Sequence, residues 1–234
     1  MKKYLVFLAA ALVQAGAWSA TYTYAGVPYT AAAITNYSSC TAGTCANFTA
    51  AMAQSGSFTT AAPLPANLNN ADIASLITSF SFSDGLTPYN SADPDTTLVG
   101  AQASTNASGG VLAIELSFQH WADNSPHVLG SRMDVMILRL LARKNSQCQG
   151  VVFQSPSGRD VCQHVDFDAA SSRVTFAAPV VPGAWTVTGL PPAAANAVPA
   201  LGDWAALCLA CVLAGTGWWM TQRRSFRRGG VGLR

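Results

Sequence analysis

Apolar and polar residues alternate along much of the chain, most regularly over residues 111–119 (VLAIELSFQ). Successive side chains of a strand point to opposite faces, so one face of this segment would be apolar and the other polar. The apolar face would carry Leu112, Ile114, Leu116 and Phe118, and the polar face Glu115, Ser117 and Gln119. The pattern predicts a half-buried strand, entered through the turn residues 106–110 (NASGG).

Similar short runs recur through the middle of the chain, at 21–24, 47–51, 57–60, 78–83, 98–103, 151–154, 161–167, 173–176 and 185–188. Turn-forming pairs separate many of them, namely Ser55-Gly56, Asp84-Gly85, Ser157-Gly158 and Pro182-Gly183. Short strands between regular turn signals are typical of an all-β domain. We therefore predict a mainly β fold, an antiparallel β-sandwich of jelly-roll type over residues 21–190.

Two segments show a different pattern. Residues 132–144 (RMDVMILRLLARK) fit helical spacing but also alternate as a strand, and we favour the strand because β-rich neighbours would need it as a partner. Residues 72–76 resemble a single helical turn, with Asn70 as a candidate cap.

The N-terminus has the pattern of a secretory signal peptide. Met1-Lys2-Lys3 is followed by an apolar run over residues 4–13 that is too short to span a bilayer. Small residues in the stretch 17–20 (AWSA) then predict a signal-peptidase site between Ala20 and Thr21. Residues 1–20 are therefore expected to be removed during export.

The C-terminus carries a second apolar run, at 201–220, with Asp203 as its only charge. A helix of this length would cover about 30 Å, the thickness of a hydrocarbon core. Tryptophans stand near both ends, and a basic cluster follows: Arg223, Arg224, Arg227 and Arg228. This layout predicts a transmembrane helix with a cytoplasmic C-terminus. Cys208 and Cys211 within the run are expected to behave as small apolar residues.

The segment before this helix, Val198-Pro199-Ala200-Leu201-Gly202-Asp203-Trp204, gives the tail a further meaning. A short proline motif, an apolar helix and an arginine cluster at the C-terminus resemble the bacterial sorting tails called IPTL-CTERM, which are related to PEP-CTERM tails. The family pattern is Ile-Pro-Thr-Leu-Ser-x-Trp. Pro199, Leu201 and Trp204 match it, Val198 is a conservative change, and Ala200 and Gly202 depart from it. The resemblance implies transient membrane retention and then removal of the tail by an exosortase.

The stretch 55–85 (SGSFTTAAPLPANLNNADIASLITSFSFSDG) resembles a segment found in exported proteins with PEP-CTERM-type tails. There it leads into a β-sandwich domain of unknown function. The expected organisation is thus a signal peptide (1–20), an exported β-sandwich (21–190), a linker (191–197) and a sorting tail (198–234).

Charge is segregated along the 234-residue chain, whose formal net charge is +2. Two of the 13 basic residues lie in the leader and five follow the apolar run, while one of the 11 acidic residues lies in the tail. The domain keeps six basic and ten acidic residues, a net charge of −4. No basic patch is available for a phosphate backbone, so we expect no nucleic-acid partner.

Four cysteines remain in the expected domain: Cys40, Cys45, Cys148 and Cys162. An even number in an exported domain favours disulfides, and three connectivities are possible. We predict the local pairs, Cys40 with Cys45 and Cys148 with Cys162, because each cysteine lies beside turn residues.

Several residues could carry chemistry. A strand over 162–168 would place Cys162, His164, Asp166 and Asp168 on one face, which could bind a metal, although a solvated face is the expectation. His120, His127 and Trp121 flank a loop where Trp121 could stack on a sugar. Asp93 and Asp95 lack the rest of a calcium loop. We expect no catalytic site, cofactor or metal.

The sequence thus predicts an exported, surface-sorted protein without enzymatic activity, with a structural or interaction role in the envelope or extracellular polymer layer of a Gram-negative bacterium. Its expected partners are signal peptidase, an exosortase, the inner membrane during transit and extracellular polysaccharide. A carbohydrate-binding module is the first alternative, and it would expose Trp121 and Tyr89. A secreted hydrolase is the second; because Glu115 is the only glutamate, it would need paired aspartates or a cleft joining His120 and His164.

Overall fold

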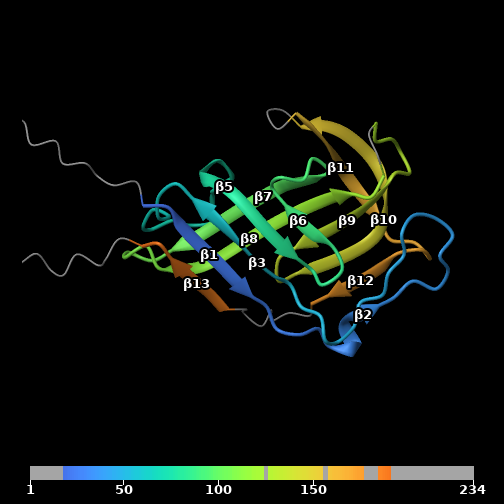
Figure 1. Ribbon diagram of the computed structural model, residues 1–234, viewed down its shortest axis with the longest axis horizontal. Helices are drawn as coiled ribbons and strands as arrows, with labels where there is room; N and C mark the ends of the chain where they lie inside the picture. The colour runs from blue at the N-terminus through green and yellow to red at the C-terminus, as the bar shows by residue number, and fades with distance from the viewer. Residues whose placement is uncertain (1–17, 124–125, 155–157, 177–183, 191–234) are drawn as a thin grey trace, which may run out of the picture. The chain divides into compact units, whose positions relative to one another are not determined.

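The computed structural model describes residues 18–123, 126–154, 158–176 and 184–190, and these form two antiparallel sheets (Figure 1). The first sheet has the order β13 (Ala184–Thr188), β1 (Ala20–Ala25), β3 (Ser55–Thr60), β5 (Ile77–Ser83) and β6 (Pro88–Asn90). The second has the order β2 (Ile34–Thr35), β12 (Ser172–Thr175), β10 (Leu141–Gln154), β9 (Arg132–Ile137), β8 (Val111–Trp121), β7 (Thr96–Thr105) and β4 (Ala71–Asp72). Strand β11 (Arg159–Asp166) pairs with β10 outside this path, and two 3₁₀ turns, η1 (Ala31–Ala33) and η2 (Ala74–Leu76), lie in connecting segments.

The main core lies between the two sheets, as in a β-sandwich. Tyr22 and Phe58 of the first sheet stack with their ring centroids 4.8 Å apart. Phe82 of the first sheet meets Phe118 of the second, with centroids 5.1 Å apart. Ile114, Leu116 and Phe118 are buried as the alternation predicts, whereas Leu112, near the start of β8, is 66% exposed. The mainly β prediction is confirmed.

A second apolar cluster forms on the other face of β8 and β9, where β11 packs against them. Its buried members are Trp121, Met133, Val135, Cys148 and Cys162. The Gln119 side chain donates to the Cys162 carbonyl at 2.8 Å and accepts from the Cys162 amide at 2.9 Å. A glutamine from β8 therefore satisfies backbone groups of β11 that would otherwise be buried without partners.

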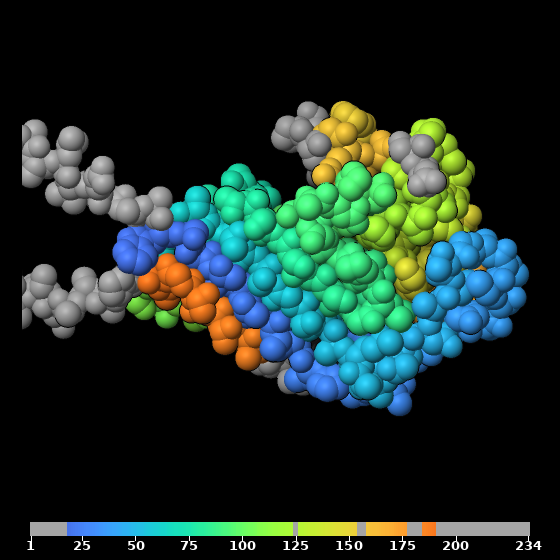
Figure 2. Space-filling view, viewed as in Figure 1, coloured from blue at the N-terminus to red at the C-terminus, as the bar shows by residue number. Residues whose placement is uncertain are grey.

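The two ends of the described domain lie side by side. Thr21 of β1 pairs with Thr188 of β13, and β1 and β13 are adjacent on the surface (Figure 2, blue and orange). Ala20 opens β1, pairs with Thr60 of β3 and is fully buried in the main core. The predicted signal-peptidase site between Ala20 and Thr21 therefore falls inside a strand.

The structure corrects two of the predicted local elements. Residues 47–51 form a loop, because the Asn36 side chain donates to the Phe48 carbonyl and accepts from the Phe48 amide in place of a neighbouring strand. The expected turn at Ser55-Gly56 is instead the start of β3, where Gly56 lets the backbone approach Phe82 closely.

The two ambiguous segments resolve differently. Residues 132–144 are extended, as we favoured, but they form β9 and the start of β10 with a turn between them at Arg139, which has a φ of 67°. The predicted helical turn is the short η2, whose first residue Ala74 donates its amide to Asp72 Oδ1 at 2.8 Å. The N-cap position is Ile73, without a side-chain cap hydrogen bond, so the prediction of Asn70 as the cap is wrong.

Strands β7, β8, β9 and β10 are consecutive neighbours in one sheet, so this part of the fold is a meander and differs from the strand order of a jelly roll. Among the residues described, no helix is long and apolar enough to cross a membrane. The apolar run at 201–220, the sorting motif and the arginine cluster lie outside the described residues.

Candidate functional site

A buried polar cluster joins the two sheets at the turn between β5 and β6. Asp84 begins this turn, and its Oδ1 accepts from the amides of Leu86 at 2.9 Å and Thr87 at 2.7 Å. Its Oδ2 accepts from the Tyr89 hydroxyl at 3.1 Å, while its backbone carbonyl accepts from the Tyr29 hydroxyl at 2.7 Å. The Asp-Gly turn signal thus produces a carboxylate that faces into the sandwich.

Asp134 of β9 brings a second buried carboxylate to this cluster. Its Oδ2 accepts from Thr87 Oγ1 at 2.8 Å and forms an ion pair with Lys144 Nζ of β10 at 2.7 Å. Its Oδ1 accepts from the Asn145 amide at 2.7 Å. Thr87 therefore links the two carboxylates, since its amide donates to Asp84 and its hydroxyl donates to Asp134.

The electrostatics of the cluster follow from its burial. The pKa of the Asp84 carboxyl is raised to about 6, mainly by desolvation and also by the nearby Asp134 carboxylate, although the backbone hydrogen bonds from Thr87 and Leu86 lower it. Desolvation also raises the pKa of both the Tyr29 and the Tyr89 phenol. Asp84 and Asp134 both have no exposed surface, so this pair of carboxylates connects the sheets and is closed to an outside substrate.

His120 lies beside this cluster on β8, opposite Asp134 in the strand register. Its Nδ1 is 3.2 Å from Asp93 Oδ2 and 3.1 Å from Thr96 Oγ1, and Thr96 Oγ1 also donates to Asp93 Oδ2 at 3.0 Å. Asp93 Oδ1 accepts from the Asp95 amide at 3.0 Å. The Asp93-Pro-Asp95 segment is thus a turn that orients His120.

Trp121, which the sequence suggested as a surface for stacking on a sugar, is covered in the structure. Trp121 is 3% exposed, and the His127 ring stacks on it with centroids 4.1 Å apart. Asp160 of β11 fixes both residues: its carbonyl accepts from Trp121 Nε1 at 3.0 Å, and its Oδ2 lies 3.1 Å from His127 Nδ1. Tyr89 is fully buried as well. Neither aromatic ring that the carbohydrate-binding alternative required is open to a sugar.

The predicted face of Cys162, His164, Asp166 and Asp168 does not form one site. Cys162 is buried in a disulfide, whereas His164 and Asp166 are exposed on β11. Asp168 lies beyond the strand and pairs with Arg132 at 2.7 Å, which lowers the pKa of its carboxyl to about 2. Within the described ranges, no group of three or more histidine, cysteine, aspartate or glutamate side chains is placed to hold a metal.

Both predicted disulfides are present, Cys40–Cys45 and Cys148–Cys162. Cys148 and Cys162 are buried, and they join β10 to β11 within the second apolar cluster. The Cys148–Cys162 disulfide thus fixes β11 in the position where the side chains of Gln119 and Trp121 hydrogen-bond to its backbone.

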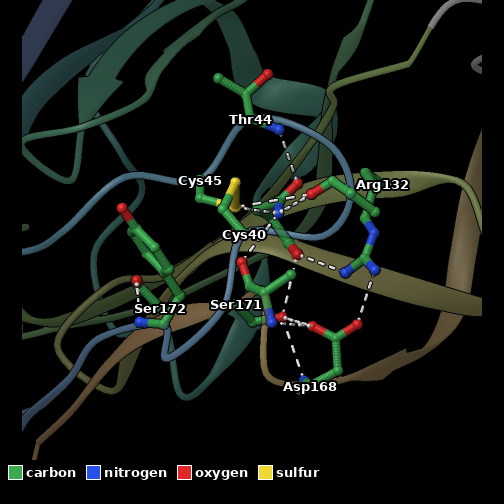
Figure 3. Close-up of a disulfide and its surroundings, with 11 residues drawn as sticks. Cys40, Thr44, Cys45, Arg132, Asp168, Ser171 and Ser172 are labelled. Atoms are coloured by element: carbon green, nitrogen blue, oxygen red, sulfur yellow. Dashed lines mark hydrogen bonds and ion pairs between the residues drawn. A yellow bond between two sulfur atoms is a disulfide. The ribbon is translucent and has the colours of Figure 1, made fainter.

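The Cys40–Cys45 loop is held by a residue more than a hundred positions away. Asn145, at an irregular point of β10 with a φ of 59°, accepts from the Thr44 amide at 3.1 Å and donates to the Ala42 carbonyl at 2.8 Å. Figure 3 shows Thr44 and the disulfide beside the pair of Arg132 and Asp168. The Asn145 carbonyl in turn accepts from Arg132 Nη1 at 3.0 Å. The backbone amide of Asn145 also donates to Asp134 Oδ1. Asn145 therefore hydrogen-bonds both to the exposed disulfide loop and to the buried pair of carboxylates.

The sequence reasoning missed the cluster of Asp84, Thr87, Asp134 and Lys144. One signal was available: Asp134 is a single acidic residue within the apolar run MDVMI, in a segment read as a strand. A lone charge among core positions indicates a buried partner, and here the partner is Lys144.

The sorting motif, the arginine cluster and Cys208 with Cys211 lie beyond the residues that the structure describes, so their assignment stays a prediction. Comparison of the chain with protein-family models, with curated proteins and with solved structures finds no match.

Proposed function

We propose that this chain is an exported, surface-sorted protein with a structural or interaction role in the envelope or extracellular polymer layer of a Gram-negative bacterium. The observation that carries the proposal is the pair of closed disulfides, one of them buried in an apolar cluster. Disulfides persist in oxidising compartments, which the chain would reach by export. The signal-like N-terminus supplies the route.

The proposed route continues through the tail. An inner-membrane precursor would be held by the helix at 201–220, with the arginine cluster on the cytoplasmic side. An exosortase would then read Val198, Pro199, Leu201 and Trp204, remove the tail and pass the domain to the surface. Proline disfavours helix at the residue before it, so Pro199 would keep the recognition segment extended.

A non-catalytic role fits the state of the candidate residues. His120 and His127 are each paired with an aspartate, and the two buried carboxylates are enclosed. Glu115 stands exposed on β8. His164 is exposed on β11, whereas the His120 ring contacts Asp93 and Thr96, so these contacts do not favour the hydrolase alternative.

Pulse-labelling in a bacterium that encodes an exosortase tests this proposal. The wild-type chain should pass from a membrane-bound form to a shorter form at the cell surface, detected with an antibody against the β-domain. Pro199→Ala or Trp204→Ala should hold the full-length form in the membrane. The double variant Cys208→Ala with Cys211→Ala is the matched control and should be processed normally. A wild-type chain that stays full-length and membrane-embedded would reduce the tail to a simple anchor.

A further inference from the structure

The first strand of the domain, β1, begins at Ala20, one residue upstream of the expected mature N-terminus. Ala20 is fully buried in the main core and pairs with Thr60 of β3. Ser19 also belongs to the folded region, because Gly189, just after β13, packs against its backbone. A Cβ placed on Gly189 would lie 2.2 Å from the Ser19 carbonyl oxygen and 3.6 Å from the Ala20 Cα. Ala20 therefore belongs to the core of the sandwich, and the Ser19 backbone packs beside the end of β13.

Cleavage between Ala20 and Thr21 would damage this arrangement. It would remove a core residue and the backbone against which Gly189 packs. It would also leave a charged α-ammonium group on Thr21, which is flanked on both sides by Thr188 of β13 and Thr59 of β3. Placing a new charge within a closed ladder is unfavourable, because the charge loses part of its hydration.

The sequence offers a better site three residues earlier. Signal peptidase requires small residues at the first and third positions before the cut. For a cut after Ala20, the third position would be Trp18, the largest side chain available. For a cut after Ala17, the two positions are Ala17 and Ala15, in the stretch Ala15-Gly16-Ala17. This stretch follows the apolar run 4–13 at the distance expected of a signal-peptide end.

We infer that signal peptidase cleaves between Ala17 and Trp18, so that the mature protein begins with Trp18 and Ser19 and keeps Ala20 as the first residue of β1. This inference rests on the proposed export. The reaction is hydrolysis of the Ala17–Trp18 peptide bond: water adds its hydroxyl to the Ala17 carbonyl carbon and a proton to the Trp18 nitrogen. The new ammonium group then forms at a residue that is 49% exposed, outside the strand ladder.

The test is the identity of the N-terminal peptide of the full chain, expressed with its own leader in a Gram-negative bacterium and analysed by mass spectrometry of denatured extracts. The expected first residue is Trp18. A mature chain that begins at Thr21 would overturn this site while leaving export intact. A chain that still begins at Met1 would overturn export itself, and with it the proposed function.

Two variants separate the sites independently of folding, because the peptide is read after denaturation. Ala17→Leu places a large residue next to the inferred cut and should cause the precursor to accumulate at least tenfold over wild type. Ala20→Leu is the matched control: it blocks a cut after residue 20 and should leave the Trp18 terminus unchanged. Loss of processing in Ala20→Leu, together with normal processing in Ala17→Leu, would contradict the inference.

Discussion

At the scale of single residues, Asp84 shows how burial changes the chemistry of an ordinary turn residue. Its carboxyl has a pKa of about 6 in the folded protein, against 3.8 for the unperturbed group, and desolvation is the main cause. Between these two values, the folded state holds a proton that the unfolded chain has lost. The free energy of unfolding therefore falls as pH rises from about 4 to about 6. A shift of this size corresponds to about 3 kcal/mol at most.

Asp168 acts in a different pH window and with the opposite sign. The hydrogen bond from Arg132 lowers the pKa of its carboxyl to about 2, so its contribution to stability is present above pH 4 and is lost as pH falls towards 2. The two effects do not overlap. Together they place the maximum contribution of these groups to stability near pH 4.

We predict that Asp84→Asn removes the loss of stability between pH 4 and pH 6. Asparagine reproduces the protonated acid, since its oxygen can accept from the Leu86 and Thr87 amides while its NH₂ group faces the Tyr89 hydroxyl. Urea unfolding at pH 4 and pH 7 measures the effect. Asp166→Asn, at an exposed position of β11, is the control and should keep the wild-type decline. An unchanged decline in Asp84→Asn would mean that another group causes it.

At this scale the sequence predicts the position of Asp84 in a turn, since Asp-Gly is a turn signal, but not its burial. The residues that enclose it, Tyr29 and Asp134, are distant in the chain and reach it only after the sheets pack. The disulfide pairs could be predicted because each joins residues close in sequence. The role of Asn145 could not, because its partners Ala42 and Thr44 lie about a hundred residues away.

At the scale of elements, β8 shows both the use and the limit of hydrophobic alternation. The pattern correctly assigns Ile114, Leu116 and Phe118 to the core face, but it also assigns Leu112 there, and Leu112 is exposed. It also assigns Gln119 to solvent, whereas Gln119 is 8% exposed because β11 covers it. Alternation describes the two faces of a strand, but it carries no information about a later strand that folds over the polar face. The strand prediction for residues 47–51 was wrong for a related reason, because the Asn36 side chain, and not a neighbouring strand, hydrogen-bonds the Phe48 backbone.

We predict that Gln119→Met destabilises the domain by about 2–4 kcal/mol, because it leaves the buried amide and carbonyl of Cys162 without partners. The amide of Cys162 should also exchange with solvent faster. Urea unfolding and hydrogen exchange measure the two effects. Gln102→Met, at an exposed position of β7, is the matched control and should change stability by less than about 0.5 kcal/mol. Equal effects of the two substitutions would show that Gln119 does not support β11.

At the scale of the whole molecule, composition and hydrophobic pattern predict a β-domain between a signal peptide and a sorting tail. The structure confirms the mainly β domain and its disulfides. The pairing of β1 with β13 brings the two ends of the domain together, which no local pattern could reveal. As a result, the segments removed at the two ends would leave from neighbouring strands. The proposed export and surface sorting would account together for the signal-like N-terminus, the disulfides and the sorting-tail pattern of the C-terminus.

The most direct measurement is the intact mass, with terminal peptides, of the protein recovered from the surface of a bacterium that encodes an exosortase. The account predicts a chain that lacks the leader and the arginine-rich tail and contains Cys40–Cys45 and Cys148–Cys162 as closed disulfides. A full-length chain from Met1 to Arg234 with all six cysteines reduced, recovered only from inside the cell, would contradict it.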